Sequence, residues 1–150
     1  MLIGFEKADN NFKGRVMKFG SGGEIIHCQF IFTQYDNISA SAWDLYGIGF
    51  RSYSDTVRHE AALWEFIDFG NEKDAQLYEW FRRQLGIQYD YTGLITSFIV
   101  PSRKTQNPKT FCSEVCYGAC QQVLNLKLPV VNANYLSPQG LYNLIKTGKL

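Results

Sequence analysis

The side chains best suited to chemistry in this 150-residue chain are those of its four cysteines and two histidines. Apolar residues recur from Cys112 at intervals of three and four, which predicts a helix with one buried face. With Thr110 as the expected N-cap, the Cys112 thiol lies in the first turn, where unpaired N–H groups and the helix dipole stabilise a thiolate. Cys112 is therefore the predicted nucleophile. The buried stripe consists of Cys112, Val115, Cys116, Ala119, Cys120 and Val123.

A nucleophilic thiolate needs a base, and a histidine can serve as one. His27 falls in a β-branched and aromatic run that predicts a strand, whereas His59 falls in a polar stretch typical of a loop or strand end. We therefore expect His27 to lie within hydrogen-bond reach of the Cys112 sulfur.

The other cysteines are expected to be structural. Cys116 and Cys120 continue an apolar stripe, and free cysteine behaves as a small hydrophobe, so they are predicted to be core residues rather than metal ligands. Cys28 lies inside the predicted strand and should be unreactive. We expect no metal and no cofactor.

The strands that must position these residues follow from β-branched and aromatic runs bounded by turn residues. The first two runs flank the turn residues 35–37 and predict a β-hairpin. The run over residues 61–69 is long enough to form a central strand of the sheet. The predicted strands cover residues 25–32, 38–43, 47–51 and 61–69.

Two further helices are expected. One has Asn71 as its N-cap and ends before Gly86. The other is a short C-terminal helix with Pro138 at its first position.

Length and composition favour one domain over residues 1–150. Charged residues make up 19% of the chain and the net charge is +1, so no nucleic-acid partner is expected. The first residues lack the pattern of a signal peptide, and no run reaches the ~18 apolar residues of a membrane span. We expect a cytoplasmic or virion-associated protein.

Four short motifs add a resemblance to a known family. The motifs are His27-Cys28-Gln29-Phe30-Ile31-Phe32, Gly86-x-x-Tyr89-Asp90-x-x-Gly93-Leu94, Phe111-Cys112-Ser113-Glu114-Val115 and Ser137-Pro138. In this order, with the histidine before the cysteine, the chain resembles the circularly permuted branch of the NlpC superfamily of papain-like cysteine hydrolases. The resemblance covers nearly the whole chain.

The resemblance implies an α+β fold, a single papain-like domain in which the helix carrying the nucleophile packs on an antiparallel sheet carrying the histidine. It implies Cys112 as nucleophile, His27 as base and Tyr89 near the oxyanion or substrate. Tyr89 as a packing aromatic is an equally good interpretation.

The third catalytic residue departs from the family pattern, which often has Glu on the strand after the histidine. Here that strand offers Ser41 and Ser39, with Asp44 just beyond it, and we favour Ser41. A serine accepts a hydrogen bond from imidazole but brings no charge to stabilise imidazolium. Gln29, on the same strand face as His27, is the other candidate for orienting the ring or lining the cleft.

These residues predict a cysteine hydrolase that cleaves an amide, in a peptide or a peptidoglycan stem, through a thioester intermediate. One alternative is an acyltransferase or thioesterase acting on lipid-like substrates. The other is a non-catalytic binding or structural protein that retains the fold. The expected partner is accordingly a peptide, peptidoglycan or acyl substrate, and the oligomeric state is left open.

Overall fold

The computed structural model describes residues 1–9, 18, 21–43, 46–57, 61–89, 109–133 and 136–148. Its strands and helices confirm an α+β fold. In chain order they are β1 (Leu2–Lys7), β2 (Ile25–Phe32), β3 (Ile38–Trp43), β4 (Gly47–Ser52), α2 (Tyr53–Val57), η1 (Ala61–Leu63), β5 (Trp64–Asp68), α3 (Asp74–Arg82), β6 (Gln88–Tyr89), β7 (Lys109–Thr110), α5 (Cys112–Gln122) and α6 (Pro138–Gly148).

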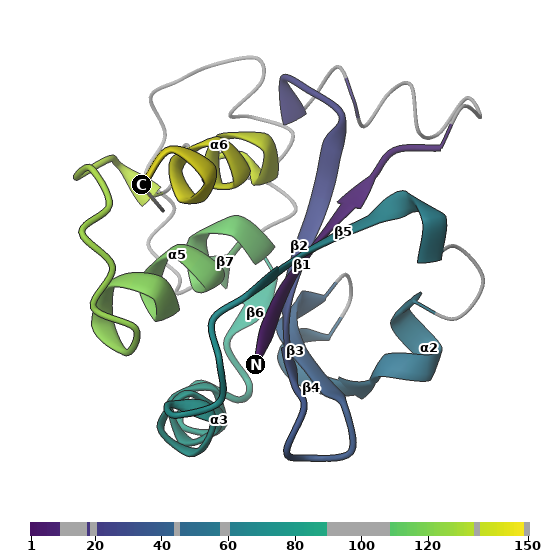
Figure 1. Cartoon of the computed structure of the whole chain (residues 1–150), viewed down its shortest axis with the longest axis vertical. Coiled ribbons are helices and arrows are strands. Elements are labelled where there is room, and N and C mark those ends of the chain that lie inside the picture. The colour runs from purple at the N-terminus through teal and green to yellow at the C-terminus, as the bar shows by residue number, and fades with distance from the viewer. Residues whose placement is uncertain are drawn as a thin grey trace.

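The centre of the fold is a five-stranded antiparallel sheet in the order β4-β3-β2-β1-β5 (Figure 1). The predicted hairpin of β2 and β3 is confirmed. Its turn places Asp36 and Asn37 at φ 49° and 55°, a conformation that Asn and Asp tolerate better than most residues.

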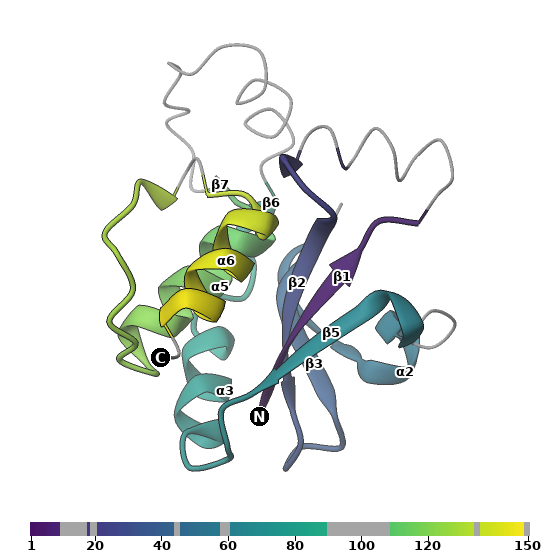
Figure 2. The same cartoon turned by 45° about the horizontal axis from the view of Figure 1, so that its top comes forward.

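Helices α3, α5 and α6 cover one face of this sheet, and α5 and α6 lie side by side (Figure 2). The core between the helices and the sheet is aromatic where α3 packs. Phe81 of α3 makes ring contacts with Phe30 and Phe32 of β2, and all three side chains are fully buried. Cys28 shares the strand face of these phenylalanines, because side chains alternate along a strand. It therefore faces the helices.

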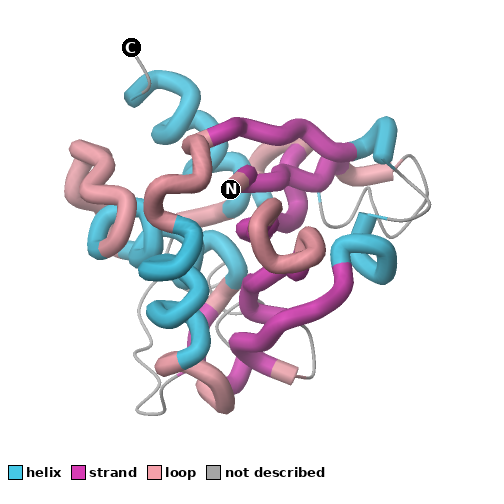
Figure 3. The backbone as a smooth tube through the Cα atoms, turned by 60° about the horizontal axis from the view of Figure 1, so that its bottom comes forward, coloured by secondary structure: helices cyan, strands magenta, loops and turns pink. Residues whose placement is uncertain are grey.

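The opposite face of the sheet carries polar side chains beneath the short helix α2. Gln29 Nε2 donates to Thr56 Oγ1 (3.2 Å), and the hydroxyls of Thr56 and Ser39 are 3.3 Å apart. Gln29 and Ser39 are fully buried. Figure 3 shows the resulting arrangement, with the strands between the larger helices on one side and a short helical segment on the other.

A charged cluster holds α6 against the sheet edge. Glu65 of β5 accepts hydrogen bonds from Lys7 Nζ (2.6 Å) and Tyr142 Oη (2.5 Å), and Lys146 Nζ lies 3.6 Å away. The hydrogen bond from Lys7, followed by the one from Tyr142, lowers the pKa of the Glu65 carboxyl to about 2. The cluster therefore stays charged over the whole neutral range.

Two sequence-based expectations about this framework were wrong, and one strand was not predicted. The strand expected over 61–69 is shorter, Trp64–Asp68, and lies at the sheet edge rather than centrally. The inner place between β2 and β5 belongs to β1, for which no strand was predicted. Helix α3 begins at Asp74 after Lys73, because Asn71 offers its backbone carbonyl rather than its side chain to the Asp74 N–H (3.2 Å).

The start of the cysteine helix also differs from expectation. Its N-cap is Phe111, not Thr110. Thr110 pairs instead with Tyr89 in the short parallel β6–β7 ladder, so its backbone is extended and cannot cap. The predicted start of the last helix is confirmed, since Pro138 is its first residue and Ser137 Oγ accepts from the Gly140 N–H (3.1 Å).

Gly47 should be the glycine least tolerant of substitution in the sheet. It has φ +72°, and an added Cβ would lie 2.0 Å from the Ile87 carbonyl oxygen, which accepts from the Ile48 N–H (2.8 Å). We expect Gly47→Ala to lower the free energy of unfolding by about 2–3 kcal/mol, the sum of left-handed strain and a lost backbone hydrogen bond.

Gly70→Ala is the matched control for this prediction. Gly70 has φ +71° but nothing within 4 Å of an added Cβ, so only the strain of about 1 kcal/mol applies. Both variants are compared by urea denaturation. Equal losses of stability would contradict the role assigned to the close approach of β4 and β6.

Candidate functional site

The candidate site lies where the first turn of α5 meets β2 and β3. Cys112 is the first residue of α5, and its side chain is only 3% exposed. Glu114 Oε2 accepts from the Phe111 N–H (3.4 Å), which satisfies one backbone donor at the start of the helix. The sequence-based expectation that a helix would place Cys112 in its first turn is confirmed.

The environment of Cys112 favours its thiolate. A hydrogen bond from the Cys28 side chain lowers the pKa of the Cys112 thiol well below its ordinary value, despite the opposing effect of burial. The charge and hydrogen bond of the His27 imidazole lower the pKa further, as does a hydrogen bond from the Cys28 backbone. Opposite charge and donated hydrogen bonds both favour the ionised form of an acid.

The neighbouring thiols have the opposite tendency. Burial, followed by hydrogen bonds with Cys112 and Cys116, raises the pKa of the Cys28 thiol well above its ordinary value. Burial likewise raises the pKa of the Cys120 thiol. Cys116 Sγ lies 3.8 Å from the Cys28 carbonyl oxygen. All four cysteines are free and buried, and Cys116 and Cys120 belong to the hydrophobic core as expected.

His27 is held between two indole rings. Its ring centroid lies 5.0 Å from that of Trp43 and 6.2 Å from that of Trp64. The β1–β2 pairing shifts register here, because Glu6 pairs with His27 whereas Lys7 pairs with Ile25. The irregularity therefore falls immediately before His27, whereas His27 and Cys28 pair regularly with Glu6 and Phe5.

The predicted third residue makes a different contact. Ser41 is fully buried, and its Oγ donates to the Cys28 carbonyl (2.7 Å). Ser39 Oγ meets Thr56 on the polar side of the sheet, as Gln29 does. That either serine orients the His27 ring stays a prediction. The suggested roles of Gln29, orienting the same ring or lining a substrate cleft, stay predictions as well.

Other predicted residues are only partly described by the structure. The backbone of Tyr89 pairs with that of Thr110, two residues before Cys112, but its side chain lies outside the described part. Asp44 and His59 lie outside the described residues altogether.

One residue of the site was missed in the sequence. Cys28 was expected to be inert, yet it is the largest influence on the pKa of Cys112. The signal that could have revealed it is the alternation of Cys28 with Phe30 and Phe32, which predicts a thiol on the same face as two core aromatics and hence facing the cysteine helix.

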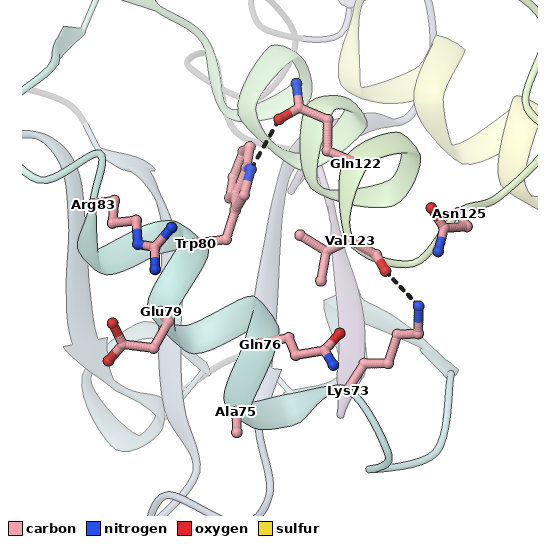
Figure 4. A pocket seen from close by; sticks show the side chains of 9 residues that line it. All are labelled: Lys73, Ala75, Gln76, Glu79, Trp80, Arg83, Gln122, Val123 and Asn125. Atoms are coloured by element: carbon pink, nitrogen blue, oxygen red, sulfur yellow. Dashed lines mark hydrogen bonds between the residues drawn. The ribbon is translucent and has the colours of Figure 1, made fainter.

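A separate cleft of about 510 Å³ lies between α3 and the other end of α5 (Figure 4). Two hydrogen bonds cross it, from Lys73 Nζ to the Val123 carbonyl (2.8 Å) and from Trp80 Nε1 to Gln122 Oε1 (3.0 Å). Gln122 is ten residues from Cys112 along the helix, about 15 Å at 1.5 Å per residue. The cleft is therefore not part of the thiol site. Its lining residues are Lys73, Ala75, Gln76, Glu79, Trp80, Arg83, Gln122, Val123 and Asn125.

Comparison with known proteins gives one structural likeness. No family model matches the chain, and no curated protein matches it in sequence. The fold is similar to a crystal structure described as metalloprotein YiiX of Escherichia coli O157:H7, DUF1105. The match has a TM-score of 0.66 and 12% identity, and it covers 95% of this chain and 91% of that chain. At this identity the likeness shows a shared fold alone.

This finding corrects the family assigned from the sequence. The structure that shares the fold is a DUF1105 metalloprotein, so membership of the NlpC superfamily of papain-like hydrolases is wrong. The predicted amide-cleaving cysteine hydrolase is overturned with it, and neither alternative gains support. The peptide, peptidoglycan and acyl substrates depended on that assignment and stay untested predictions.

Local structure explains why the motifs misled. Ser137 and Pro138 cap and begin a helix, and Gly86 adopts φ +89° in the turns after α3. Serine and proline are common at helix starts, and glycine is common just after helix ends, in proteins of any family. Short motifs at the ends of helices therefore indicate where a helix begins or ends, and they are weak evidence of family membership.

A metal centre, which the neighbour's description suggests, does not fit the described residues. Within them, no three His, Cys, Asp or Glu side chains are grouped so that they could hold a metal ion. In the same part of the chain, no helix has the length and apolar character needed to span a membrane.

Proposed function

We propose that the functional centre of this protein is the Cys112 thiolate, acting as a nucleophile toward a small electrophile, with His27 as its proton acceptor. A single observation carries the proposal: Cys112 begins helix α5 as a buried residue, and the neighbouring Cys28 and His27 lower the pKa of its thiol despite that burial. Cysteine reacts as the thiolate, and a lowered pKa is what makes a particular thiol reactive at neutral pH.

The contrast among the cysteines supports this choice. Burial alone raises a thiol pKa, as it does for Cys120 farther along the same helix. At Cys112 the same burial is outweighed by Cys28 and His27. A cysteine that served only as a core residue would not need neighbours that lower the pKa of its thiol.

Ser41 supports the site as a positioning residue. Its buried hydroxyl fixes the Cys28 carbonyl, and Cys28 contacts Cys112 through both its side chain and its backbone. The serine thus acts on the thiolate through the β2 backbone.

Alkylation of the native, full-length protein with iodoacetamide across pH 5–10 tests the proposed function. We expect Cys112 to be modified first and its rate to level off below the ordinary thiol pKa of about 8.5, because the thiolate is already formed there. Peptide mass mapping assigns each modified cysteine. Faster modification of another cysteine, or a Cys112 rate that still rises steeply above pH 9, would overturn the proposal.

A further inference from the structure

Glu6 and His27 are cross-strand neighbours on two inner strands of the sheet. Glu6 on β1 pairs directly with His27 on β2, and the pairing of these strands is regular from Leu2 to Glu6. Residues directly opposite each other in an antiparallel pair project to the same face, with Cβ atoms about 4.5–5.5 Å apart. Both residues are half-buried. The register therefore places the Glu6 carboxylate beside the imidazole ring.

The aromatic neighbours of His27 confine its ring but offer it no acceptor. Trp64 reaches His27 from β5, on the far side of β1, with ring centroids 6.2 Å apart. The indole has room over β1 because Gly4 lacks a side chain, whose Cβ would lie 3.0 Å from Trp64 Cε3. Trp43 lies 5.0 Å from His27 and donates its indole N–H to the Gly49 carbonyl (3.1 Å). An indole nitrogen only donates, so the acceptor for an imidazole N–H must come from another side chain.

Three of the side chains expected from the sequence to orient the imidazole are neutral and have other contacts. Ser41 Oγ donates to a backbone carbonyl of β2. Ser39 and Gln29 both contact Thr56 of α2. A neutral acceptor fixes the ring but brings no charge to stabilise an imidazolium, whereas the carboxylate of Glu6 does both.

We propose that Glu6 is a positioning residue for His27, whose imidazole N–H donates to the Glu6 carboxylate. This inference rests on the proposed function, in which His27 accepts the proton of the Cys112 thiol. As that proton passes from sulfur to imidazole, the ring becomes a cation. The carboxylate then holds the N–H on the side away from the sulfur and stabilises the positive charge. Glu6 acts on the thiolate only through His27.

The charged and titratable groups around His27, in the part of the chain that the structure describes, act in both directions. Glu6 on β1 and the Cys112 thiolate on α5 favour the imidazolium. Arg51 on β4 disfavours it, and its guanidinium carbon lies 4.7 Å from the ring centroid of Trp43. The groups that reach His27 from β3 and β5 are the two uncharged indoles. Loss of the Glu6 charge should therefore lower the pKa of His27.

The test is an NMR titration of His27 in the reduced full-length protein with Cys112→Ser, so that no thiolate contributes. The chain has two histidines, and His59→Asn identifies which imidazole signal belongs to His27. We expect Glu6→Gln to lower the pKa of His27 by about one unit, because an opposite charge nearby raises the pKa of a histidine. Glu6→Asp keeps the charge and should lower it by less.

The matched control is Glu24→Gln. Glu24 is exposed and pairs with Lys18 (3.0 Å), so this change should leave the pKa of His27 as it is in the parent protein. Equal His27 pKa values in the Glu6→Gln and Glu24→Gln proteins would contradict the inference. If Glu6→Gln does not fold, the Cys112→Ser protein decides alone. A His27 pKa at or below the ordinary value of about 6.5 would then show that no carboxylate acts on the ring.

A second readout uses the protein with Cys112 intact. Glu6→Gln should slow the alkylation of Cys112 at pH 6 about threefold, and Glu6→Asp should restore part of the rate, because a less stable imidazolium leaves less thiolate. A rate unchanged by Glu6→Gln would mean that Glu6 does not act through His27. If Cys112 is not the most reactive thiol of the wild type, the proposed function fails, and the titration of His27 still decides the role of Glu6.

Discussion

Replacement of His27 by asparagine should slow the alkylation of native Cys112 on the order of tenfold at pH 6. The imidazole contributes both a charge and a hydrogen bond that lower the pKa of the Cys112 thiol. Without them the pKa rises, and below the pKa each unit of rise reduces the thiolate fraction tenfold. The rate should recover as the pH is raised toward the ordinary thiol range, so the loss is largest in acid.

The control for this prediction is Cys120→Ser. Cys120 is buried on the same helix but does not contribute to the pKa of Cys112, so the Cys112 rate should stay within twofold of the wild type. Alkylation in denaturant should be equal in all three proteins. An unchanged pH profile in the His27→Asn protein would show that the imidazole does not act on this thiol.

Asp74→Ala should be the most destabilising change at a charged residue in the described part of the chain, about 3–5 kcal/mol. Asp74 is fully buried and lies 3.0 Å from the amino group of Met1, which is itself 1% exposed. It also accepts from the Gln34 N–H (3.4 Å). Removal of the carboxylate leaves a buried cation without its partner and a backbone donor without its acceptor.

The comparison for Asp74 is Glu72→Ala. Glu72 is exposed two residues earlier, and surface substitutions of this kind change stability by about 0.5 kcal/mol at most. Urea denaturation of both variants measures the difference. A loss below about 1 kcal/mol at Asp74 would show that the ion pair is replaced at little cost, as some buried pairs are.

The amino-acid sequence determined the local parts of this protein. β-Branched and aromatic runs between turn residues defined β2 and β3 to the residue, and the three- and four-residue spacing of small apolar side chains defined the buried face of α5. The place of Cys112 in the first turn of a helix also followed from the sequence, because a helix start is a local property.

Only the tertiary structure decided what surrounds Cys112. Strand order depends on pairing between distant segments, so the inner place of β1 and the edge place of β5 could not be derived from their own residues. The influence of both His27 and Cys28 on the pKa of Cys112 was likewise not derivable from the strand alone, because side chains of consecutive residues point to opposite faces of a regular strand. Two of the four short motifs from which a family was inferred, those containing Gly86 and Ser137-Pro138, meet local demands of turning and capping. The lowered pKa of the Cys112 thiol depends most on Cys28, which lies 84 residues earlier in the chain and is brought near only by the packing of α5 on β2.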